Sequence, residues 1–198
     1  MRSIQKMCFA AALAATLAVP AFSQSAPGGD NIQDRKENQQ DRISNGDASG
    51  QLTAGETRNL EKKESDVNHE ERDMRKLDNG HLTAADRTTL NQQQNQLSRQ
   101  IYTDKHNTAV QNTTPKSEVG KRQENQQDRI ALGVKSGQLT AGESSRLEGR
   151  EARVNHEIAR DRAANGGKLT QQERARVNRQ QNRTSRAIYR DKHNGRRQ

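Results

Sequence analysis

The sequence predicts an all-α protein with two tandem helical-hairpin modules, small thin cores, and a partly disordered linker and termini. Three observations lead to this prediction: a long segment recurs, four capping motifs interrupt the chain, and large apolar side chains are scarce. Only 28% of the residues are hydrophobic and 2% are aromatic. Because so little apolar surface can offset the conformational entropy lost on folding, narrow helical seams are favoured over a large core.

Residues 1–23 have the features of a secretory signal peptide. Arg2 and Lys6 accompany an apolar stretch, and Ala21 and Ser23 fit the small-residue rule for a cleavage site. The apolar stretch is shorter than the roughly 20 residues that a membrane-spanning helix needs. We therefore expect cleavage after Ser23, a periplasmic or secreted protein, and no membrane span after cleavage.

One segment of the chain occurs twice. Arg35–Asn107 aligns without a gap on Arg122–Asn194, at an offset of 87 residues and with about 40 of 73 positions identical. Such self-similarity is the signature of a duplicated structural unit. We refer to these segments as the first copy and the second copy. The predicted boundaries are a first module at 30–107, a turn-prone linker at 108–117 and a second module at 118–194.

A shorter motif, Gly-x-Leu-Thr-x-x-acid, occurs twice in each copy. Its glycine fits the left-handed conformation that closes a preceding helix, and its threonine suits the N-cap of the next helix. The acidic residue three positions later can complete a capping box. Four helix–turn–helix corners are therefore expected, with structural caps at Gly50, Thr53, Gly80, Thr83, Gly137, Thr140, Gly167 and Thr170.

The stretches between these corners predict two long helices in each copy. In the first copy they are Thr53–Leu77 and Thr83–Asn107, and neither contains a proline. Apolar residues such as Leu60 and Val67 recur on one face of an otherwise polar helix, a pattern typical of a two- or three-helix seam. With a short helix expected around Gln33–Asn45, each module is a short helix followed by a long antiparallel hairpin.

The corner motif resembles the second half of an EF-hand calcium loop. Asn79–Asp86 matches that family's pattern from the fifth to the twelfth loop position. The leading positions, which supply oxygen ligands in the family, are occupied by other residue types at the last three corners. Only the first corner offers a set, which is Asn45, Asp47, Ser49 and Glu56. The resemblance implies degenerate EF-hand-like corners with weak calcium binding there, and ordinary capped corners are the alternative.

Other chemistry finds little support in the sequence. The only cysteine, Cys8, lies in the expected signal peptide. His69 and His106 would lie roughly 20 Å apart in the hairpin, which disfavours a metal site between them. Asp104 with His106, near Glu56, is the only cluster that the expected topology allows. No nucleophile–base pair or phosphate-binding glycine loop stands out, so we expect that the protein is not an enzyme and has no cofactor, apart from calcium in the EF-hand alternative.

Charge divides the chain into unlike halves. Residues 24–115 contain 12 basic and 15 acidic side chains, and residues 116–198 contain 20 basic and 10 acidic ones. Five arginines in the last predicted helix follow one another at three- and four-residue steps, which places them on one face. They are Arg176, Arg179, Arg183, Arg186 and Arg190. Such a face can bind phosphates, anionic polymers or an acidic protein, and a merely solvated helix surface is the alternative.

These features lead to three hypotheses about function. The leading one is an exported helical-repeat protein that acts by binding or scaffolding. The second is a degenerate EF-hand-like protein that binds calcium weakly. The third is a polyanion-binding protein that uses the basic second module, with an anionic envelope polymer or an acidic protein surface as partner. Self-association between the acidic first module and the basic second one is a further possibility.

Overall fold

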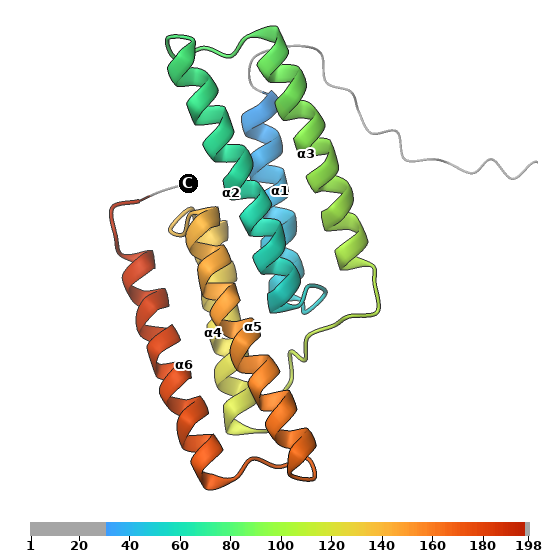
Figure 1. Cartoon of the computed structure of the whole chain (residues 1–198), viewed down its shortest axis with the longest axis vertical. Coiled ribbons are helices and arrows are strands. Elements are labelled where there is room, and N and C mark those ends of the chain that lie inside the picture. The colour runs from blue at the N-terminus through green and yellow to red at the C-terminus, as the bar shows by residue number, and fades with distance from the viewer. Residues whose placement is uncertain (1–30, 197–198) are drawn as a thin grey trace, which may run out of the picture.

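The computed structural model describes residues 31–196, and these residues fold into helices without a β-strand (Figure 1). The all-α prediction is therefore confirmed for this part of the chain, and the expected signal peptide lies outside it. No helix in the described range is long and apolar enough to cross a membrane. The helices are α1 (Asn31–Ala48), α2 (Ala54–Leu77), α3 (Ala84–Lys105), α4 (Glu118–Lys135), α5 (Ala141–Ala164) and α6 (Gln171–Lys192).

Four of these helices begin with the same capping box. The N-cap threonine accepts a hydrogen bond from the backbone N–H three residues later, and the acidic side chain at that position accepts from the threonine backbone. Two otherwise unpaired amide groups are thereby satisfied at each corner. The N-caps are the threonines expected from the motif, Thr53, Thr83, Thr140 and Thr170, and each motif glycine adopts a positive φ.

α1 and α4 lie against the last helix of their own copy through buried glutamines. Gln94, which is fully buried, donates to the backbone oxygen of Ile32 at 2.9 Å, and Gln39 donates to the backbone oxygen of Gln94 at 2.6 Å. Gln181 and Gln126 repeat these bonds in the second copy. Since buried polar groups are costly unless hydrogen-bonded, these paired amides let a chain with few aliphatic residues bring three helices together.

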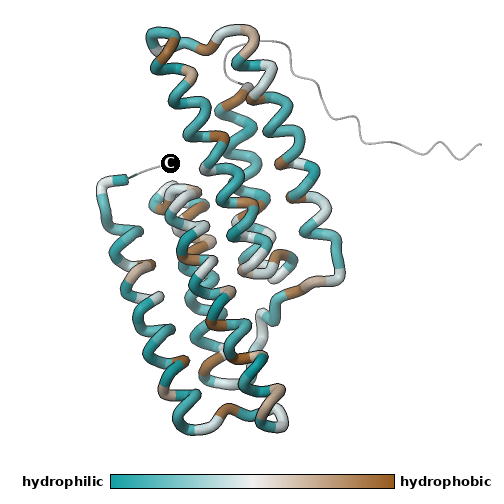
Figure 2. Tube along the Cα trace, viewed as in Figure 1, coloured by the Kyte–Doolittle hydropathy of each residue, from teal (hydrophilic) through white to brown (hydrophobic). Residues whose placement is uncertain are grey.

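The apolar core is divided into four small clusters, and each cluster draws its residues from one copy only. In the first copy, one cluster lies around Ile43 and Leu60 and another around Val67 and Leu90. Figure 2 shows that hydrophobic positions are isolated along mostly hydrophilic helices. No apolar cluster joins the two copies within the described residues, so the contact between the copies has a different chemistry.

The two copies meet where α2 lies against α5 and α1 against α4 (Figure 1). α2 and α5 run in opposite directions, since Ser145 near the start of α5 bonds to the backbone of Arg58, whereas Gly142 lies against Ser65 further along α2. Between α1 and α4, Gln127 donates to Asp47 at 2.6 Å. Polar side chains therefore make the contacts across this boundary.

The linker at 108–117 contains no helix, and α4 begins directly after it. It is nevertheless held at the first corner: Gln111 donates its backbone N–H to the Gly50 oxygen at 2.9 Å, and its side chain accepts from the Ala54 N–H at 3.1 Å. Gly50 cannot carry a side chain here, because an added Cβ would lie 2.6 Å from the Gln111 oxygen. These hydrogen bonds connect the linker to the first corner through Gln111.

Candidate anion-binding surface

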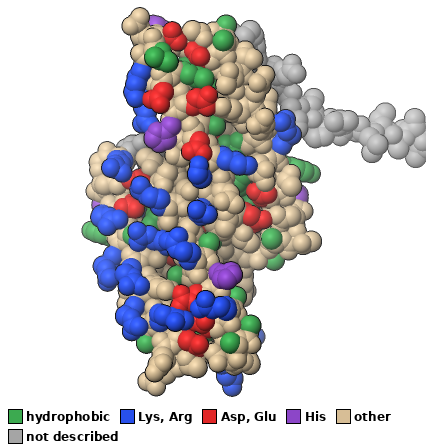
Figure 3. Space-filling model, viewed as in Figure 1, with side chains coloured by type: hydrophobic (Ala, Val, Ile, Leu, Met, Phe, Trp, Pro, Cys, Tyr) green, Lys and Arg blue, Asp and Glu red, His purple; other side chains and the backbone are tan. Residues whose placement is uncertain are grey.

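The arginine row predicted in the last helix lies on the exposed surface of α6. All five of its members are exposed. Figure 3 shows that Lys and Arg side chains gather on the lower left of the molecule, over α5 and α6, whereas the upper part shows fewer of them. Many of the basic residues of the second copy therefore lie on this face.

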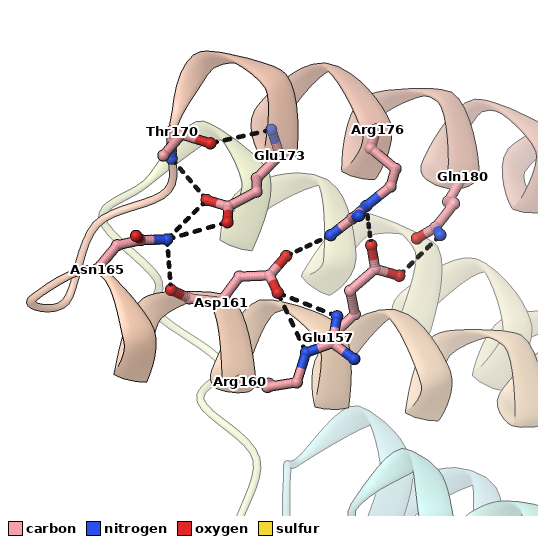
Figure 4. A network of polar contacts seen from close by, with 8 residues as sticks. All are labelled: Glu157, Arg160, Asp161, Asn165, Thr170, Glu173, Arg176 and Gln180. Atoms are coloured by element: carbon pink, nitrogen blue, oxygen red, sulfur yellow. Dashed lines mark hydrogen bonds and ion pairs between the residues drawn. The ribbon is translucent and has the colours of Figure 1, made fainter.

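Arg176 differs from the rest of the row because it is tied to α5. Its guanidinium pairs with Glu157 and, at 2.7 Å, with Asp161 (Figure 4). Desolvation acts to lower the pKa of Arg176, but the two carboxylates outweigh it and raise the pKa. This arginine already has its anionic partners within the protein, so its first role is to hold the start of α6 on α5.

The network around Arg176 replaces an apolar contact of the first copy. Asp161 also pairs with Arg160 at 3.1 Å (Figure 4). The bond from Gln180 to Glu157 at 2.8 Å, in contrast, repeats the bond from Gln93 to Glu70 in the first copy. The residue that corresponds to Asp161 in the first copy is Met74, which packs against an apolar cluster. The second copy therefore joins its hairpin here through charge.

The surface extends onto α5, which supplies arginines that the sequence analysis does not single out. Arg150 and Arg153 border a groove of about 350 Å³ with Arg183 of α6. An adjoining groove of about 360 Å³ is bordered by Arg146 and Arg190, and again by Arg150. We call this pair of hollows the arginine groove, and its members are Arg146, Arg150, Arg153, Arg183, Arg190 and Arg196.

Three carboxylates border the arginine groove, and each is already engaged. Glu157 pairs with Arg176, and Asp191 pairs with Arg190 at 3.1 Å. Glu143 completes the capping box of α5 and also accepts from Asn194 at 2.8 Å. Burial acts to raise the pKa of Glu143, but its hydrogen bonds outweigh this and lower it, so the group is ionised at neutral pH. Six arginines against three carboxylates leave the groove positively charged.

An arginine-lined groove has a defined chemistry. The guanidinium fork presents planar pairs of N–H donors that match phosphate, sulfate and carboxylate groups. Within the described residues, Arg183 and Arg153 have no ion pair, so their donors remain available to a ligand. Because the two hollows adjoin along α5, the groove suits an elongated anion with several charged groups.

The first copy has the same helices but not the same charges. The positions that correspond to Arg146, Arg153, Arg183 and Arg190 are neutral or acidic there: Asn59, Asp66, Gln96 and Thr103. Arg146 and Arg153 could have been found in the sequence by comparing the copies position by position. Their membership of the surface with α6 could not, because it depends on how α5 lies beside α6.

The side chains of the four EF-hand candidate residues bond to different partners and do not share a common ligand position. Asn45 and Asp47 are in the last turn of α1, where Asp47 is buried and bonds to Thr57 and Gln127. Glu56 bonds to its own N-cap, and its other oxygen accepts from Asn107. The Ser49 hydroxyl bonds to the Gly46 backbone. In the described part of the chain, no group of three or more acidic, histidine or cysteine residues could hold a metal ion.

The histidines near the helix ends make local contacts. His106 stacks on Tyr102, and His193 stacks on Tyr189, with ring centroids 4.2 and 4.1 Å apart. Each histidine also places its Nδ1 within 2.7 Å of the tyrosine's backbone oxygen. Asp104, expected near His106, accepts instead from Gln100. These contacts account for the repeated DKHN phrase as the closing turn of α3 and of α6.

Sequence reasoning misses a second group of charged residues, which is buried between the copies. Asp47, Glu61 and Glu64 of the first copy and Glu148 and Glu151 of the second are each at most 2% exposed. The signal was present, since Glu61 and Glu64 recur as Glu148 and Glu151 at equivalent positions. Local sequence does not reveal their burial, because glutamates beside an apolar stripe usually remain in water.

Comparison with protein-family models, curated proteins and solved structures finds no match for this chain. Function is therefore inferred from the chemistry of its own surfaces.

Proposed function

We propose that this is an exported helical-repeat protein that acts by binding rather than by catalysis, and that it holds an anionic envelope polymer in the arginine groove. The observation that carries the proposal is the difference between the copies. Equivalent helices with equivalent caps carry Arg146, Arg153, Arg183 and Arg190 in the second copy and neutral or acidic residues in the first, whereas Arg150 corresponds to Lys63. The fold alone does not require these charges, because the first copy forms the same hairpin without them.

The arrangement of the arginines supports a binding role. Like charges at neighbouring positions on a helix destabilise it by a few tenths of a kcal/mol per pair. Arg183 and Arg190 of the α6 row border the same groove as the arginines of α5, so their repulsion persists until an anion enters. A multivalent anion would relieve that repulsion and gain several charge-assisted hydrogen bonds at once.

The test compares two variants that each lose three positive charges. In the groove variant, Arg153, Arg183 and Arg190 are replaced by Gln. In the control variant, Lys121, Lys135 and Lys168, which are exposed outside the groove, are replaced by Gln. Binding to long-chain polyphosphate and to a sulfated matrix is measured at several salt concentrations.

The groove variant is expected to lose about ten- to hundredfold in affinity at low salt, since each exposed ion pair contributes up to about 1 kcal/mol. Its affinity should also depend less on salt, because fewer ions are displaced. The control should keep most of its affinity. Equal losses in both variants would show that only overall charge matters, and the groove would then be a solvated surface.

Export is tested separately on the natural protein. The intact mass of the chain recovered from the envelope or the medium should correspond to a start at Gln24, and recovery from the cytoplasm with Met1 or Cys8 retained would contradict it. Size measurement in the same sample distinguishes polymer binding from self-association between the acidic and basic copies, because the latter raises the mass without an added anion.

A further inference from the structure

The boundary between the copies contains five buried carboxyl groups. Asp47 comes from α1, Glu61 and Glu64 come from α2, and Glu148 and Glu151 come from α5. We call these five residues the carboxyl cluster. Because α2 and α5 run antiparallel and their glutamates are at equivalent positions, Glu61 and Glu148 lie near the centre of the contact and act on one another electrostatically. Charged residues of this kind are almost never fully buried unless paired.

The hydrogen bonds of the carboxyl cluster run across the boundary but leave several oxygens without a partner. Gln127 of α4 donates one amide group to both Asp47 at 2.6 Å and Glu148 at 2.5 Å, so it joins α1, α4 and α5. Gln40 donates to Glu61 at 3.0 Å. Within the described residues, no hydrogen bond reaches either carboxyl oxygen of Glu64 or of Glu151.

Too few basic side chains lie near the carboxyl cluster to neutralise five ionised carboxylates. From α1, Lys36 acts on Glu64 but donates its hydrogen bond to Glu71. From α2, Arg58 lies against Gly149. α4 adds a further acid, Asp128, which acts on Asp47. No charged side chain of α3 or α6 forms a hydrogen bond or ion pair with the cluster in the part of the chain that the structure describes.

Protonation resolves this imbalance. Burial raises the pKa of Asp47 to about 7 and, together with the neighbouring acid Glu71, that of Glu64 to about 7. It raises the pKa of Glu151 to about 8, with Asp47 adding to the effect. Burial and the neighbouring acids also hold the pKa values of Glu61 and Glu148 well above the usual range. A neutral carboxyl group can donate its proton to the oxygen of a neighbour, which an ionised group cannot do.

We propose that the carboxyl cluster is a proton-dependent latch that holds α1 and α2 against α4 and α5 in acid and lets them separate in alkali. The apolar clusters favour opening at this boundary rather than general unfolding, because each lies within one copy and remains intact when the copies part. The linker permits it, since it connects the copies outside the α2–α5 contact (Figure 1). The hollow bordered by Arg150, Arg153 and Arg183 lies within the second copy, so the latch does not depend on the proposed anion binding there. Arg146 and Arg196 also border the space between the copies.

The experiment measures compactness as a function of pH. It uses the expected mature chain from Gln24, which contains every described residue and no cysteine. Small-angle scattering should show a compact particle at pH 5 and a larger radius of gyration at pH 9, with helix content retained in circular dichroism. Separated but folded copies give this combination, whereas loss of helix content together with the expansion would overturn the latch as a specific opening.

A disulfide across the boundary provides the closed control. A Cβ built on Gly142 would lie 3.9 Å from the Cβ of Ser65, within the range that a disulfide bridges. The oxidised Ser65→Cys, Gly142→Cys variant should remain compact at pH 9, and its reduced form should expand as the parent does. If the oxidised variant expanded as much as the parent, the opening would lie elsewhere.

Two isosteric variants identify the groups that titrate. The first is a triple variant that should remain compact at pH 9, because an amide imitates the neutral carboxyl group. It carries Glu61→Gln, Glu148→Gln and Glu151→Gln. The control, Glu37→Gln with Glu124→Gln, changes equivalent positions outside the cluster and should expand like the parent. The proposal would be overturned if the parent protein were equally compact at both pH values. It would also be overturned if micromolar calcium or manganese made the parent compact at pH 9, because the cluster would then be a cation site.

Discussion

The two copies differ in which of their basic residues are repeated. Some basic residues that support the fold are repeated: Arg42 and Arg129 both bond to a serine of the last helix, at equivalent positions and distances of 2.6 and 2.7 Å. Lys105 and Lys192 are repeated in the same way. Arg153 and Arg183, in contrast, face the arginine groove and correspond to Asp66 and Gln96. Comparison of the copies thus distinguishes basic residues that make the same bond in both from those present only in the second copy, some of which, like Arg176, also bond within it.

Transfer of the groove to the first copy should have the largest effect. The graft places the missing arginines on α2 and α3 through four substitutions: Asn59→Arg, Asp66→Arg, Gln96→Arg and Thr103→Arg. In a protein whose own groove carries the three Gln substitutions, this graft should restore about ten- to hundredfold in affinity for polyphosphate at low salt, since several ion pairs return. Titration calorimetry measures both affinity and stoichiometry.

The graft has a matched control in the unaltered protein. There, the same four substitutions should raise the number of binding sites from one to two, because the helix geometry is common to both copies. A graft that raises affinity without adding a site would show that the groove depends on features specific to α5 and α6.

The stability of the protein should depend on pH through the carboxyl cluster at the boundary, because the apolar clusters within each copy contain no titrating group. The carboxyl groups of the cluster have raised pKa values in the folded chain, so the unfolded chain ionises first as the pH rises above about 4.5. Folding then loses stability from that pH up to the folded values, about 7 for Asp47 and Glu64 and about 8 for Glu151. The melting temperature should therefore fall by on the order of 10 °C between pH 5 and pH 8.5.

The triple Gln variant of Glu61, Glu148 and Glu151 supplies the comparison for this melting experiment. It lacks three of the titrating groups, so most of its pH dependence should be lost. If parent and variant lost stability in parallel, the pH dependence would come from residues outside the boundary.

Local signals in the sequence predict the helices and their corners. The capping motif identifies Thr53 and Thr140 because the interactions it encodes span only three residues. α1, expected around Gln33–Asn45, proves to be longer by a few residues at each end, since no capping motif marks its start. Helix boundaries without such a motif depend on packing, which the local sequence does not specify.

The candidate sites are only partly predictable, because both depend on contacts between helices distant in sequence. The row on α6 follows from helical periodicity, but its union with Arg150 of α5 requires the packed hairpin. The carboxyl cluster lies between copies, and residues 87 positions apart in sequence, such as Glu61 and Glu148, meet only when α2 lies on α5. Periodicity assigns a face to each residue but not the neighbour that covers it.

The corners should respond to loss of a cap and not to calcium. Thr140→Ala removes the hydroxyl that accepts from the Glu143 N–H and should lower the free energy of unfolding by roughly 0.5–2 kcal/mol. Thr53→Ala should cost a similar amount, because the first corner has the same capping box. Thermal melts with and without millimolar calcium measure both. A calcium-dependent rise in melting temperature that Glu56→Gln abolishes would support the EF-hand alternative instead.

Replacement of Arg176 should have the smallest effect on anion binding, because this member of the α6 row is paired within the protein. Its partners Glu157 and Asp161 already neutralise it, so Arg176→Thr should weaken binding to polyphosphate less than Arg183→Gln does. Since the guanidinium is exposed and screened by solvent, the loss of these ion pairs should lower the stability only slightly. With Asp161→Met added, the second copy acquires the pair found in the first copy, Thr89 and Met74, and the stability should return. Denaturant unfolding measures the stability, and salt-dependent retention measures the binding. If Arg176→Thr lost as much affinity as Arg183→Gln, Arg176 would belong to the binding surface. Its ion pairs with Glu157 and Asp161 would then form only in the protein without ligand.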